Sequence, residues 1–398
     1  MKGSNAKVVR EKLEQATQLM KKHEIDTWLV LTREGSDPAL PLLVGVRSVH
    51  QAAIFIRESG KHIVLTSKSD AGSYESTNLF DEVRVYESSM EKAFTELWNE
   101  LSVEKLALNI SEQDHLCDGL TYGLYSWLKD NVGEQILHER EISSEEMLGE
   151  LRSIKTEAEI ATVAEAVRIT VEIFESVHSK LKPFMTEIEI GNLFVEEMKE
   201  RGVSSGLGDA YDPPLVCAVR HGLAHRKPSD RLVEPGDIVI IDFSMKYEDY
   251  VSDIARTFYF LKDGEQEAPA TVNHAFETAY KAITESIEAL LVDKKGYEVD
   301  AVGRKVIEEA GYPTIRHSVG HQIGRATHDG GTTLGPRRVP VRLAVEGSLK
   351  AGEIYAIEPT VIQDKGLPCM LVEENVLVTE EGPVLLSKRQ DTLWLVKR

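Results

Sequence analysis

The chain has 398 residues, with 46 Lys and Arg against 66 Asp and Glu, so its net charge at pH 7 is −20. This balance argues against a nucleic-acid partner, because phosphate backbones bind basic surfaces. The length predicts two domains. The hydrophobic content of 42% and the charged content of 28% are those of an ordinary globular protein.

The cysteines and the N-terminal segment predict a cytoplasmic protein. Cys117, Cys217 and Cys369 show no CxxC spacing, so we expect reduced thiols rather than a disulfide framework. The segment MKGSNAKVVREKLEQ lacks the apolar core of a signal peptide. The sequence contains no run of about 18 apolar residues, so it predicts no membrane-spanning helix. We therefore expect no membrane partner.

The first 140 residues alternate helical and strand patterns. We expect a helix over residues 6–23, a buried strand over 27–32 and a hairpin that turns at Ser59–Gly60. Strands follow in EVRVYE and KLALNI, on either side of a helix over residues 90–101. Helices on a sheet predict an α/β domain. The histidines of this part are scattered and form no catalytic constellation.

We predict a domain boundary after residue 145, so that residues 1–145 and 146–398 form separate domains. A Ser or Thr followed three residues later by Glu predicts helix starts at Ser143, Thr156 and Thr186. Long helical patterns cover residues 157–181 and 187–200, and strand patterns dominate from Leu215 onward. Two further helices are expected near residues 270–291 and 299–310. Runs of helices with runs of strands predict an α+β second domain.

Two aspartates interrupt a strand-rich stretch of the second domain. The segment IVIIDFSMKYEDYVSDIART, residues 238–257, places Asp242 after a β-branched run and Asp253 near the start of the next apolar run. A hairpin centred on Tyr247–Glu248 would set these residues directly opposite each other, with Cβ atoms roughly 5 Å apart. Like charges at that distance repel, so we expect a cation between them.

More acids and histidines follow in strand-like or loop patterns. They are Glu358 in GEIYAIEPTVI, Glu373 and Glu374 in MLVEENVLVT, and His317, His321 and His328 in RHSVGHQIGRATHD. A buried carboxylate must be protonated, paired or bound to metal. An Arg partner or an edge strand explains one such acid, but several acids with a histidine favour a metal site. Carboxylate and imidazole ligands suit Mn²⁺, Zn²⁺, Fe²⁺ or Co²⁺, and two ions about 3.5–4 Å apart need bridging carboxylates.

These motifs resemble the pita-bread metallopeptidases: methionine aminopeptidase, aminopeptidase P and prolidase, with creatinase as a relative. The resemblance covers the whole chain. Residues 1–140 resemble the smaller N-terminal domain of the creatinase, prolidase and aminopeptidase P branch. LRSIKTEAEIATVAEAVRI resembles the first helix of its catalytic domain, and AHRKPSDRLVEPGDIVIIDFSMKYEDYVSDIARTF resembles its first metal block. The resemblance therefore implies a creatinase-type N-terminal domain followed by a pita-bread catalytic domain.

The resemblance implies two divalent ions per subunit, with Mn²⁺ first and Co²⁺, Zn²⁺ or Fe²⁺ as alternatives. Asp242 would bind one ion, and His321 and Glu358 would bind the other. Asp253 and Glu373 would bridge both ions. Glu374 stands where the family has an acid that is not a ligand.

The resemblance also implies roles in substrate binding and catalysis. His225, His317 and His328 match histidines that contact the substrate. His328 would stabilise the tetrahedral intermediate, and Glu358 would carry the proton of the attacking water to the leaving nitrogen. The substrate would be a short peptide or dipeptide, cleaved before proline, and the protein would be a homodimer.

Three positions depart from the family pattern. Asp329 follows His328 where the family has Glu, Leu371 stands where members of this branch often have Arg, and Asp249 stands at the hairpin tip where Gly is usual. We expect Asp329 and Leu371 to surround the substrate rather than the metals. Residues that could replace the missing Arg in capturing a substrate carboxylate are Arg316, Arg325, Arg337 and Arg338.

Three functions remain open on these grounds. The first is an Xaa-Pro dipeptidase or Xaa-Pro aminopeptidase, and the short chain favours Xaa-Pro dipeptides over longer substrates. The second is a metal-dependent hydrolase or lyase of a small non-peptide metabolite on the same scaffold. The third is a non-catalytic interaction protein, which the presence of all five expected metal ligands disfavours.

Overall fold

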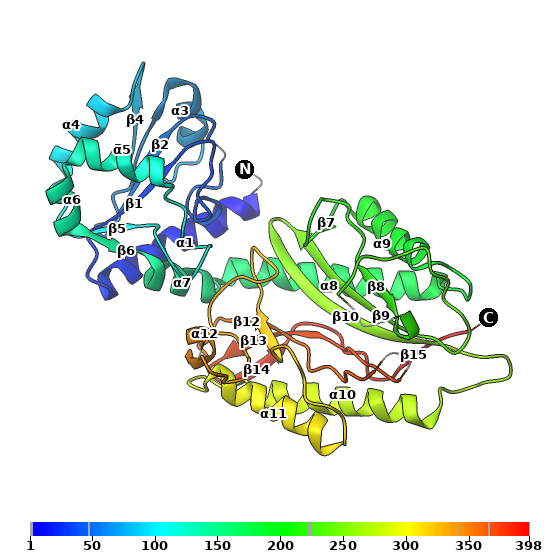
Figure 1. The fold of residues 1–398 in the computed structure, drawn as a ribbon. Coiled ribbons are helices and arrows are strands. Elements are labelled where there is room, and N and C mark those ends of the chain that lie inside the picture. Colours follow the sequence, from blue (N-terminus) through cyan, green and yellow to red (C-terminus); the bar gives the residue numbers. More distant parts are fainter. Residues whose placement is uncertain (1–2, 47, 222–224, 341, 365–366, 398) are drawn as a thin grey trace. The chain divides into compact units, whose positions relative to one another are not determined.

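The computed structural model describes residues 3–46, 48–221, 225–340, 342–364 and 367–397. The chain divides into two compact units, Met1–Arg152 and Ser153–Arg398 (Figure 1). The predicted boundary after residue 145 lies at the start of helix α7 (Glu145–Ser153), whereas the division between the units lies at its end. Among the described residues, no helix has both the length and the apolar character needed to cross a membrane.

The first unit is a six-stranded sheet with helices. The strand order is β4-β3-β2-β1-β5-β6. The strands are β1 (Thr27–Thr32), β2 (Ala52–Arg57), β3 (Ile63–Ser67), β4 (Glu82–Tyr86), β5 (Leu106–Leu108) and β6 (Glu141–Ser143). The helices are α1 (Gly3–Lys22), α2 (Leu40–Leu43), α3 (Lys68–Glu75), α4 (Glu91–Leu101), α5 (Tyr122–Val132) and α6 (Glu134–Arg140).

Burial on both faces explains the unbroken apolar pattern of β1. Trp28 and Val30 belong to one apolar cluster, and Leu29 and Leu31 belong to another. Successive side chains of a strand point to opposite faces, so each face of this sheet has its own core. The predicted hairpin is confirmed, because β2 and β3 pair antiparallel on either side of Ser59–Gly60.

The second unit contains two sheets. A five-stranded sheet has the order β15-β10-β9-β7, with β8 also paired to β9, and a four-stranded sheet has the order β11-β12-β13-β14. The strands are β7 (Ser204–Ser205), β8 (Leu215–Ala218), β9 (Ile238–Tyr247), β10 (Tyr250–Phe260), β11 (Gly320–Gln322), β12 (Ile354–Ile357), β13 (Glu374–Thr379), β14 (Gly382–Leu385) and β15 (Trp394–Val396). This mixed architecture is the α+β fold expected from the sequence.

Helices cover the sheets of the second unit. They are α8 (Glu157–Lys180), α9 (Glu187–Arg201), α10 (Ala270–Glu288), α11 (Gly296–Glu309) and the short α12 (Leu343–Glu346). Helix α8 contacts β9 and β10, while α10 contacts β12 and β14 and runs beside α11 (Figure 1). The long helices confirm the expected patterns in position and length.

Capping interactions fix two of the predicted helix starts. Thr156 and Thr186 each form a complete capping box with the Glu three residues later. The prediction for Ser143 is wrong, because this residue ends β6. Its hydroxyl donates to the carbonyl of Ile110 and accepts from the N–H of Glu145. The chain therefore starts α7 two residues after Ser143.

The β9–β10 hairpin has a different register from the one predicted. Tyr247 pairs with Tyr250, so the turn residues are Glu248 and Asp249, with φ of 45° and 67°. Positive φ at both positions is the geometry of a type I′ turn. The turn thus lies one residue later than expected, and Asp242 faces Ala255 instead of Asp253. The two aspartates are diagonal neighbours on one face, roughly 7–8 Å apart.

Candidate metal centre

Three predicted ligands form the centre of the site. Ligand atoms of Asp253, His321 and Glu373 all lie within 4.8 Å of one another. Asp253 lies on β10, His321 lies on β11, and Glu373 immediately precedes β13. The five-stranded sheet and the four-stranded sheet therefore both contribute to one cluster.

Glu358 and Asp242 extend this cluster. His321 Nε2 lies 3.6 Å from Asp253 Oδ2 and 3.9 Å from Glu358 Oε1. Glu358 directly follows β12. Asp242 lies on β9 and is the diagonal neighbour of Asp253 on β10. Asp242 is close enough for its charge to raise the pKa of Asp253, Glu358 and Glu373. The structure thus brings all five predicted metal ligands into one region of the second unit.

The negative charges of the cluster are only partly compensated, by His225 near Asp242 and by Arg256 near Glu373. Burial, followed by repulsion from neighbouring acids, raises the pKa of Asp253, Glu358 and Glu373 well above the usual range. Burial also raises the pKa of Asp242. No Lys or Arg among the described residues forms an ion pair with any of these four acids. A divalent cation would offset both the burial and the repulsion.

The ligand atoms themselves fit a metal ion. Asp253 Oδ1 is buried and accepts no hydrogen bond from the residues that the structure describes. His321 Nδ1 lies 3.3 Å from the carbonyl of Gln322, which fixes Nδ1–H as the donor and leaves the Nε2 lone pair facing the acids. Burial, with the nearby His328, lowers the pKa of His321 to about 4, so its imidazole is neutral at pH 7. A donor set of carboxylates with one imidazole suits divalent transition metals.

The three predicted substrate histidines lie next to these ligands. The rings of His328 and His321 are 4.4 Å apart between centroids, and the rings of His225 and His317 are 6.4 Å apart. His225 Nδ1 lies 3.9 Å from Asp242 Oδ2, and its side chain is 61% exposed. Burial lowers the pKa of His317 and His328. Imidazole nitrogens beside a partly open site can donate hydrogen bonds to a bound molecule or accept them from it.

A buried acid that the sequence analysis missed holds the chain next to His225. Glu187 accepts hydrogen bonds from both terminal nitrogens of Arg226, from Ser229 and from the N–H of Ala218. Burial opposes ionisation of Glu187, yet these donors lower its pKa to about 2. The sequence signal was only a Glu in the first turn of a helix, which also reads as an exposed capping residue.

The loop that carries His317 is held in a similar way. Arg304 donates to both carboxylate oxygens of Asp300 at 2.8 Å, to the carbonyl of His317 at 3.0 Å and to the carbonyl of Ile315. Asp300 also accepts from the N–H of Val319. The pair at i and i+4 on α11 therefore shapes the backbone on both sides of His317.

Two departures from the family pattern prove to be buried. Asp329 is buried and lies 3.7 Å from Lys155, whose side chain is also buried. Leu371 belongs to the main apolar core of the second unit, and its backbone exchanges hydrogen bonds with the hydroxyl of Thr257. The contact with Lys155 thus explains the acid at position 329, and the apolar core explains the leucine at position 371.

The structure gives the partners of Glu374 and of the arginines that the sequence analysis named as candidates for binding a substrate carboxylate. Glu374 pairs with the buried Arg256 at 3.1 Å, so it has the Arg partner that explains a buried acid without metal. Arg325 contacts Asp249 and Tyr250, and Arg337 pairs with Glu346. Of the four candidate arginines, Arg316 and Arg338 have no acidic partner among the described residues, and Arg338 donates to the carbonyl of Arg316.

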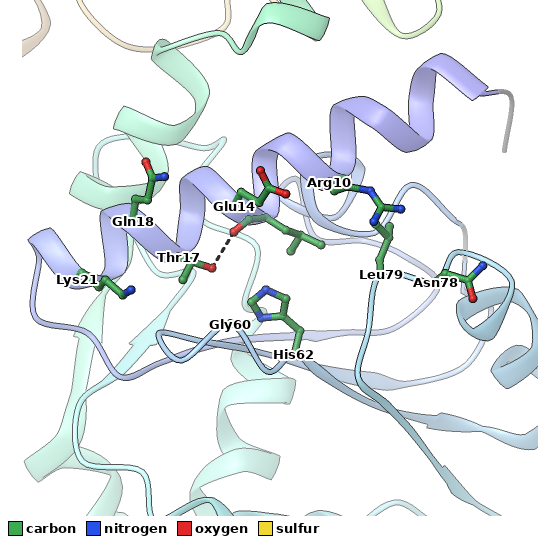
Figure 2. A pocket seen from close by; sticks show the side chains of 10 residues that line it. Arg10, Glu14, Thr17, Gln18, Lys21, Gly60, His62, Asn78 and Leu79 are labelled. Atoms are coloured by element: carbon green, nitrogen blue, oxygen red, sulfur yellow. Dashed lines mark hydrogen bonds between the residues drawn. The ribbon is translucent and has the colours of Figure 1, made fainter.

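One cavity lies in the first unit. It has a volume of about 500 Å³ and is lined by Arg10, Leu13, Glu14, Thr17, Gln18, Lys21, Gly60, His62, Asn78 and Leu79. Figure 2 shows His62 pointing from the strand side toward α1. Burial lowers the pKa of His62, in keeping with the packing role expected for histidines of this part. The ten lining residues include none of the metal-cluster residues.

Comparison with known proteins identifies relatives. The protein-family model described as metallopeptidase family M24 matches residues 161–380, which include the whole metal cluster. The uncharacterized peptidase YqhT of Bacillus subtilis is 27% identical over 269 residues, covering 67% of this chain and 69% of the relative. The uncharacterized peptidase SSP1059 of Staphylococcus saprophyticus is 26% identical over 383 residues, covering 93% of this chain and 97% of the relative.

Solved structures share the fold. An Xaa-Pro dipeptidase from Bacillus anthracis matches with a TM-score of 0.78 at 24% identity, covering 97% of this chain and 99% of the other. An X-Pro aminopeptidase from Thermotoga maritima matches with a TM-score of 0.78 at 22% identity, covering 95% of this chain and all of the other. These matches establish that the chain has the fold of those proteins.

Proposed function

Because the chain belongs to metallopeptidase family M24, we propose that it is a two-metal peptidase that cleaves short peptides before proline. One observation carries this proposal: the buried carboxylates of Asp253 and Glu373, the largely buried ones of Asp242 and Glu358, and a neutral histidine converge in the second unit, and no Lys or Arg among the described residues forms an ion pair with them. The preference for proline is supported by the Xaa-Pro dipeptidase and X-Pro aminopeptidase that share the fold.

We assign Asp242, Asp253, His321, Glu358 and Glu373 as the ligands of two divalent ions, with Mn²⁺ as the expected metal. Asp253 and Glu373 occupy the centre of the cluster and would be the bridging ligands. When bound, the ions would supply Lewis acidity and a water of lowered pKa. The carboxylates would fix the position of that water, and the buried walls would exclude others.

The remaining roles follow from position. Glu358 would hold the proton of the attacking water and transfer it to the leaving nitrogen. His328, whose ring lies beside His321, would donate a hydrogen bond to the carbonyl oxygen as the carbon becomes tetrahedral. His225 is exposed next to Asp242 and, with His317, would hold the substrate. Arg316 or Arg338 would capture the carboxylate of a dipeptide, because each lacks an acidic partner among the described residues.

Further parts of the proposal concern assembly and location. We propose that residues 1–145 are the N-terminal domain of the creatinase, prolidase and aminopeptidase P branch, that the protein is a homodimer and that it works in the cytoplasm. Neither a nucleic acid nor a membrane is expected as a partner. Xaa-Pro dipeptides would be cleaved at least as well as longer peptides, because an unpaired cation in a closed site disfavours an extended substrate.

A second candidate is a hydrolase or lyase of a small non-peptide metabolite at the same metal site. The observation in its favour is the burial of Leu371 in the apolar core, since the position offers no cation where branch members often have Arg. The first candidate remains preferred, because Arg316 and Arg338 can supply a cation from another loop.

The deciding experiment combines metal analysis with kinetics under Mn²⁺. The values of kcat/KM for Ala-Pro, Ala-Pro-Ala and Ala-Ala are compared, and Ala-Pro is expected to be the best substrate. Preference for Ala-Pro-Ala would make the protein an Xaa-Pro aminopeptidase. Two bound ions without turnover of any of the three peptides would refute the peptidase and favour the metabolite enzyme or a non-catalytic protein.

A further inference from the structure

One edge of β10 is covered by side chains instead of a strand. Strand β15 pairs with β10 only at Phe258, Tyr259 and Phe260, so the backbone groups of residues 253–257 that point away from β9 need other partners. An uncovered strand edge leaves N–H and C=O groups without hydrogen bonds, which is costly when buried. This stretch includes Asp253, the proposed bridging ligand.

Two buried carboxamides satisfy this edge at equivalent positions. The Asn375 side chain accepts from the N–H of Asp253 at 3.1 Å and donates to its carbonyl at 2.6 Å. The Gln390 side chain does the same for Thr257, with distances of 3.1 and 2.6 Å. Each carboxamide thus replaces one residue of a neighbouring strand. The first holds a residue that carries a proposed ligand, and the second holds a residue that does not.

Arg256 links the same edge to the other bridging ligand. Its guanidinium is 1% exposed, and Nη1 donates to the carbonyl of Glu373 at 2.8 Å and to that of Ala255 at 2.9 Å. Nη2 donates to Glu374 at 3.1 Å and to the carbonyl of Lys388 at 2.8 Å. The planar fork of Arg fits several fixed acceptors at once, and Glu374 balances its charge.

These contacts are reciprocal. Asn375 lies two residues after Glu373 and binds the backbone of Asp253, while Arg256 lies three residues after Asp253 and binds the backbone of Glu373. The N–H of Glu373 also donates to the carbonyl of Ala255 at 3.2 Å. Strands β10 and β13 belong to different sheets, so these bonds fix how far apart the two acids are held.

We propose that Arg256, Glu374 and Asn375 form a strand clamp that sets the distance between the bridging carboxylates of Asp253 and Glu373. The inference rests on the proposed function of this site as a two-metal centre. The clamp residues are positioning residues, because they act through the backbone of the ligands. A metal pair tolerates ligand displacements of only about 0.5 Å, so a loosened clamp weakens the pair even when the fold persists.

The chain supplies a matched control. Asn375→Leu and Gln390→Met each replace a buried carboxamide by an apolar side chain of similar size, on the same strand edge. Both changes remove two hydrogen bonds to β10, and only the first removes them from a proposed ligand residue. Arg256→Lys keeps the charge but cannot reproduce the fork of contacts.

The test uses full-length protein freed of metal with a chelator and titrated with Mn²⁺ alone. Calorimetry gives the affinity for each ion, and electron paramagnetic resonance gives the fraction of spin-coupled Mn²⁺ pairs. Asn375→Leu and Arg256→Lys are expected to weaken binding of the second ion by about 10-fold to 100-fold and to lower the coupled fraction. Gln390→Met is expected to lower the thermal midpoint while keeping the Mn²⁺ affinity within about twofold of wild type.

The outcomes separate the clamp from the proposed function. Wild-type affinity and coupling in both Asn375→Leu and Arg256→Lys, or equal weakening by Gln390→Met, would overturn the clamp even if the enzyme cleaves Ala-Pro. A wild-type protein that binds no Mn²⁺ pair would overturn the proposed function and the clamp together. If Asn375→Leu does not fold, Asn375→Asp and Gln390→Glu form a second matched pair. Weaker Mn²⁺ binding by Asn375→Asp, despite its added negative charge, would support the clamp, and unchanged binding would refute it.

Discussion

Replacing Glu187 by Gln tests whether a buried ion pair anchors the chain beside His225. Glu187 is fully buried and accepts from Arg226 at 2.6 and 2.7 Å, from Ser229 at 2.6 Å and from Ala218 at 2.9 Å. The substitution keeps the shape of the side chain but removes its charge. It also turns an amide nitrogen toward Arg226, which leaves that cation without a carboxylate.

The magnitude follows from the pKa of the carboxyl group. Its usual value is 4.5 and its value in the folded protein is about 2, a difference of about 2.5 pH units, which corresponds to about 3 kcal/mol of stability at neutral pH. Breaking one partner of a buried ion pair costs about 3–5 kcal/mol. Arg226 is partly exposed, so we expect the lower end, about 3 kcal/mol.

The dependence on pH has a defined sign. Because the pKa of Glu187 is depressed on folding, its contribution is complete above pH 4.5 and is lost as the pH falls toward 2. The difference in unfolding free energy between wild type and Glu187→Gln should therefore be constant from pH 7 to about 5.5 and shrink below pH 4.5.

Urea unfolding of the metal-free proteins measures this difference, with hydrogen exchange in peptides of residues 153–398 to isolate the second unit. Glu189→Gln is the control, because Glu189 lies one half-turn further along the same helix, is exposed and, within the described part of the chain, forms side-chain hydrogen bonds only with Thr186. Its effect should be smaller. A Glu187→Gln difference below about 1 kcal/mol at pH 7, or one that stays constant down to pH 2.5, would refute the reasoning.

Other expected outcomes concern the metal cluster and the hairpin. Asp253→Asn and Glu373→Ala should each abolish the binding of two metal ions and the activity, while leaving the fold intact. Metal analysis that finds two tightly bound ions, together with full turnover, would contradict this. Chelation should remove activity and lower the midpoint of thermal unfolding. Mn²⁺ at about 100 times its Kd should then raise the free energy of unfolding by about 2.7 kcal/mol. A thermal midpoint that does not change with Mn²⁺ would argue against a resident metal. Asp249→Gly should raise the free energy of unfolding by up to about 1 kcal/mol, because Asp249 has φ of 67°; urea unfolding that shows a loss instead would mean that its contact with Arg325 matters more.

The sequence predicted which residues lie close together better than it predicted the register of the strands that carry them. Capping boxes at Thr156 and Thr186 marked two long helices, and acids within apolar runs marked the candidate metal cluster. The hairpin register was missed because its turn is Glu248–Asp249, which lacks the Asn-Gly or Asp-Gly signal of a type I′ turn. A shift of one residue in the turn changed the partner of Asp242 from Asp253 to Ala255.

Glu373 and Glu374 show what the chain pattern alone could not separate. They are adjacent and identical, and in extended backbone they point to opposite sides. Glu373 joins Asp253 and His321, whereas Glu374 meets Arg256. The family resemblance separated the two, but their physical difference comes from the placement of β10 beside β13, and that contact joins segments that are far apart along the chain. The same distance in sequence hid Arg256 and Asn375 from the sequence analysis.

The side-chain cover of β10 also has a consequence for the order of folding. Strands β9 and β10 can form their hairpin early, because a two-residue turn joins them, but Asn375 and Gln390 arrive only when the last part of the chain docks. Contacts between such distant segments form slowly. Until then the edge of β10 at residues 253–257 is an open template for pairing with another chain. A chain cut before residue 370 should therefore aggregate through β10, and soluble, metal-competent protein should appear only after the C-terminal segment has joined the strand edge.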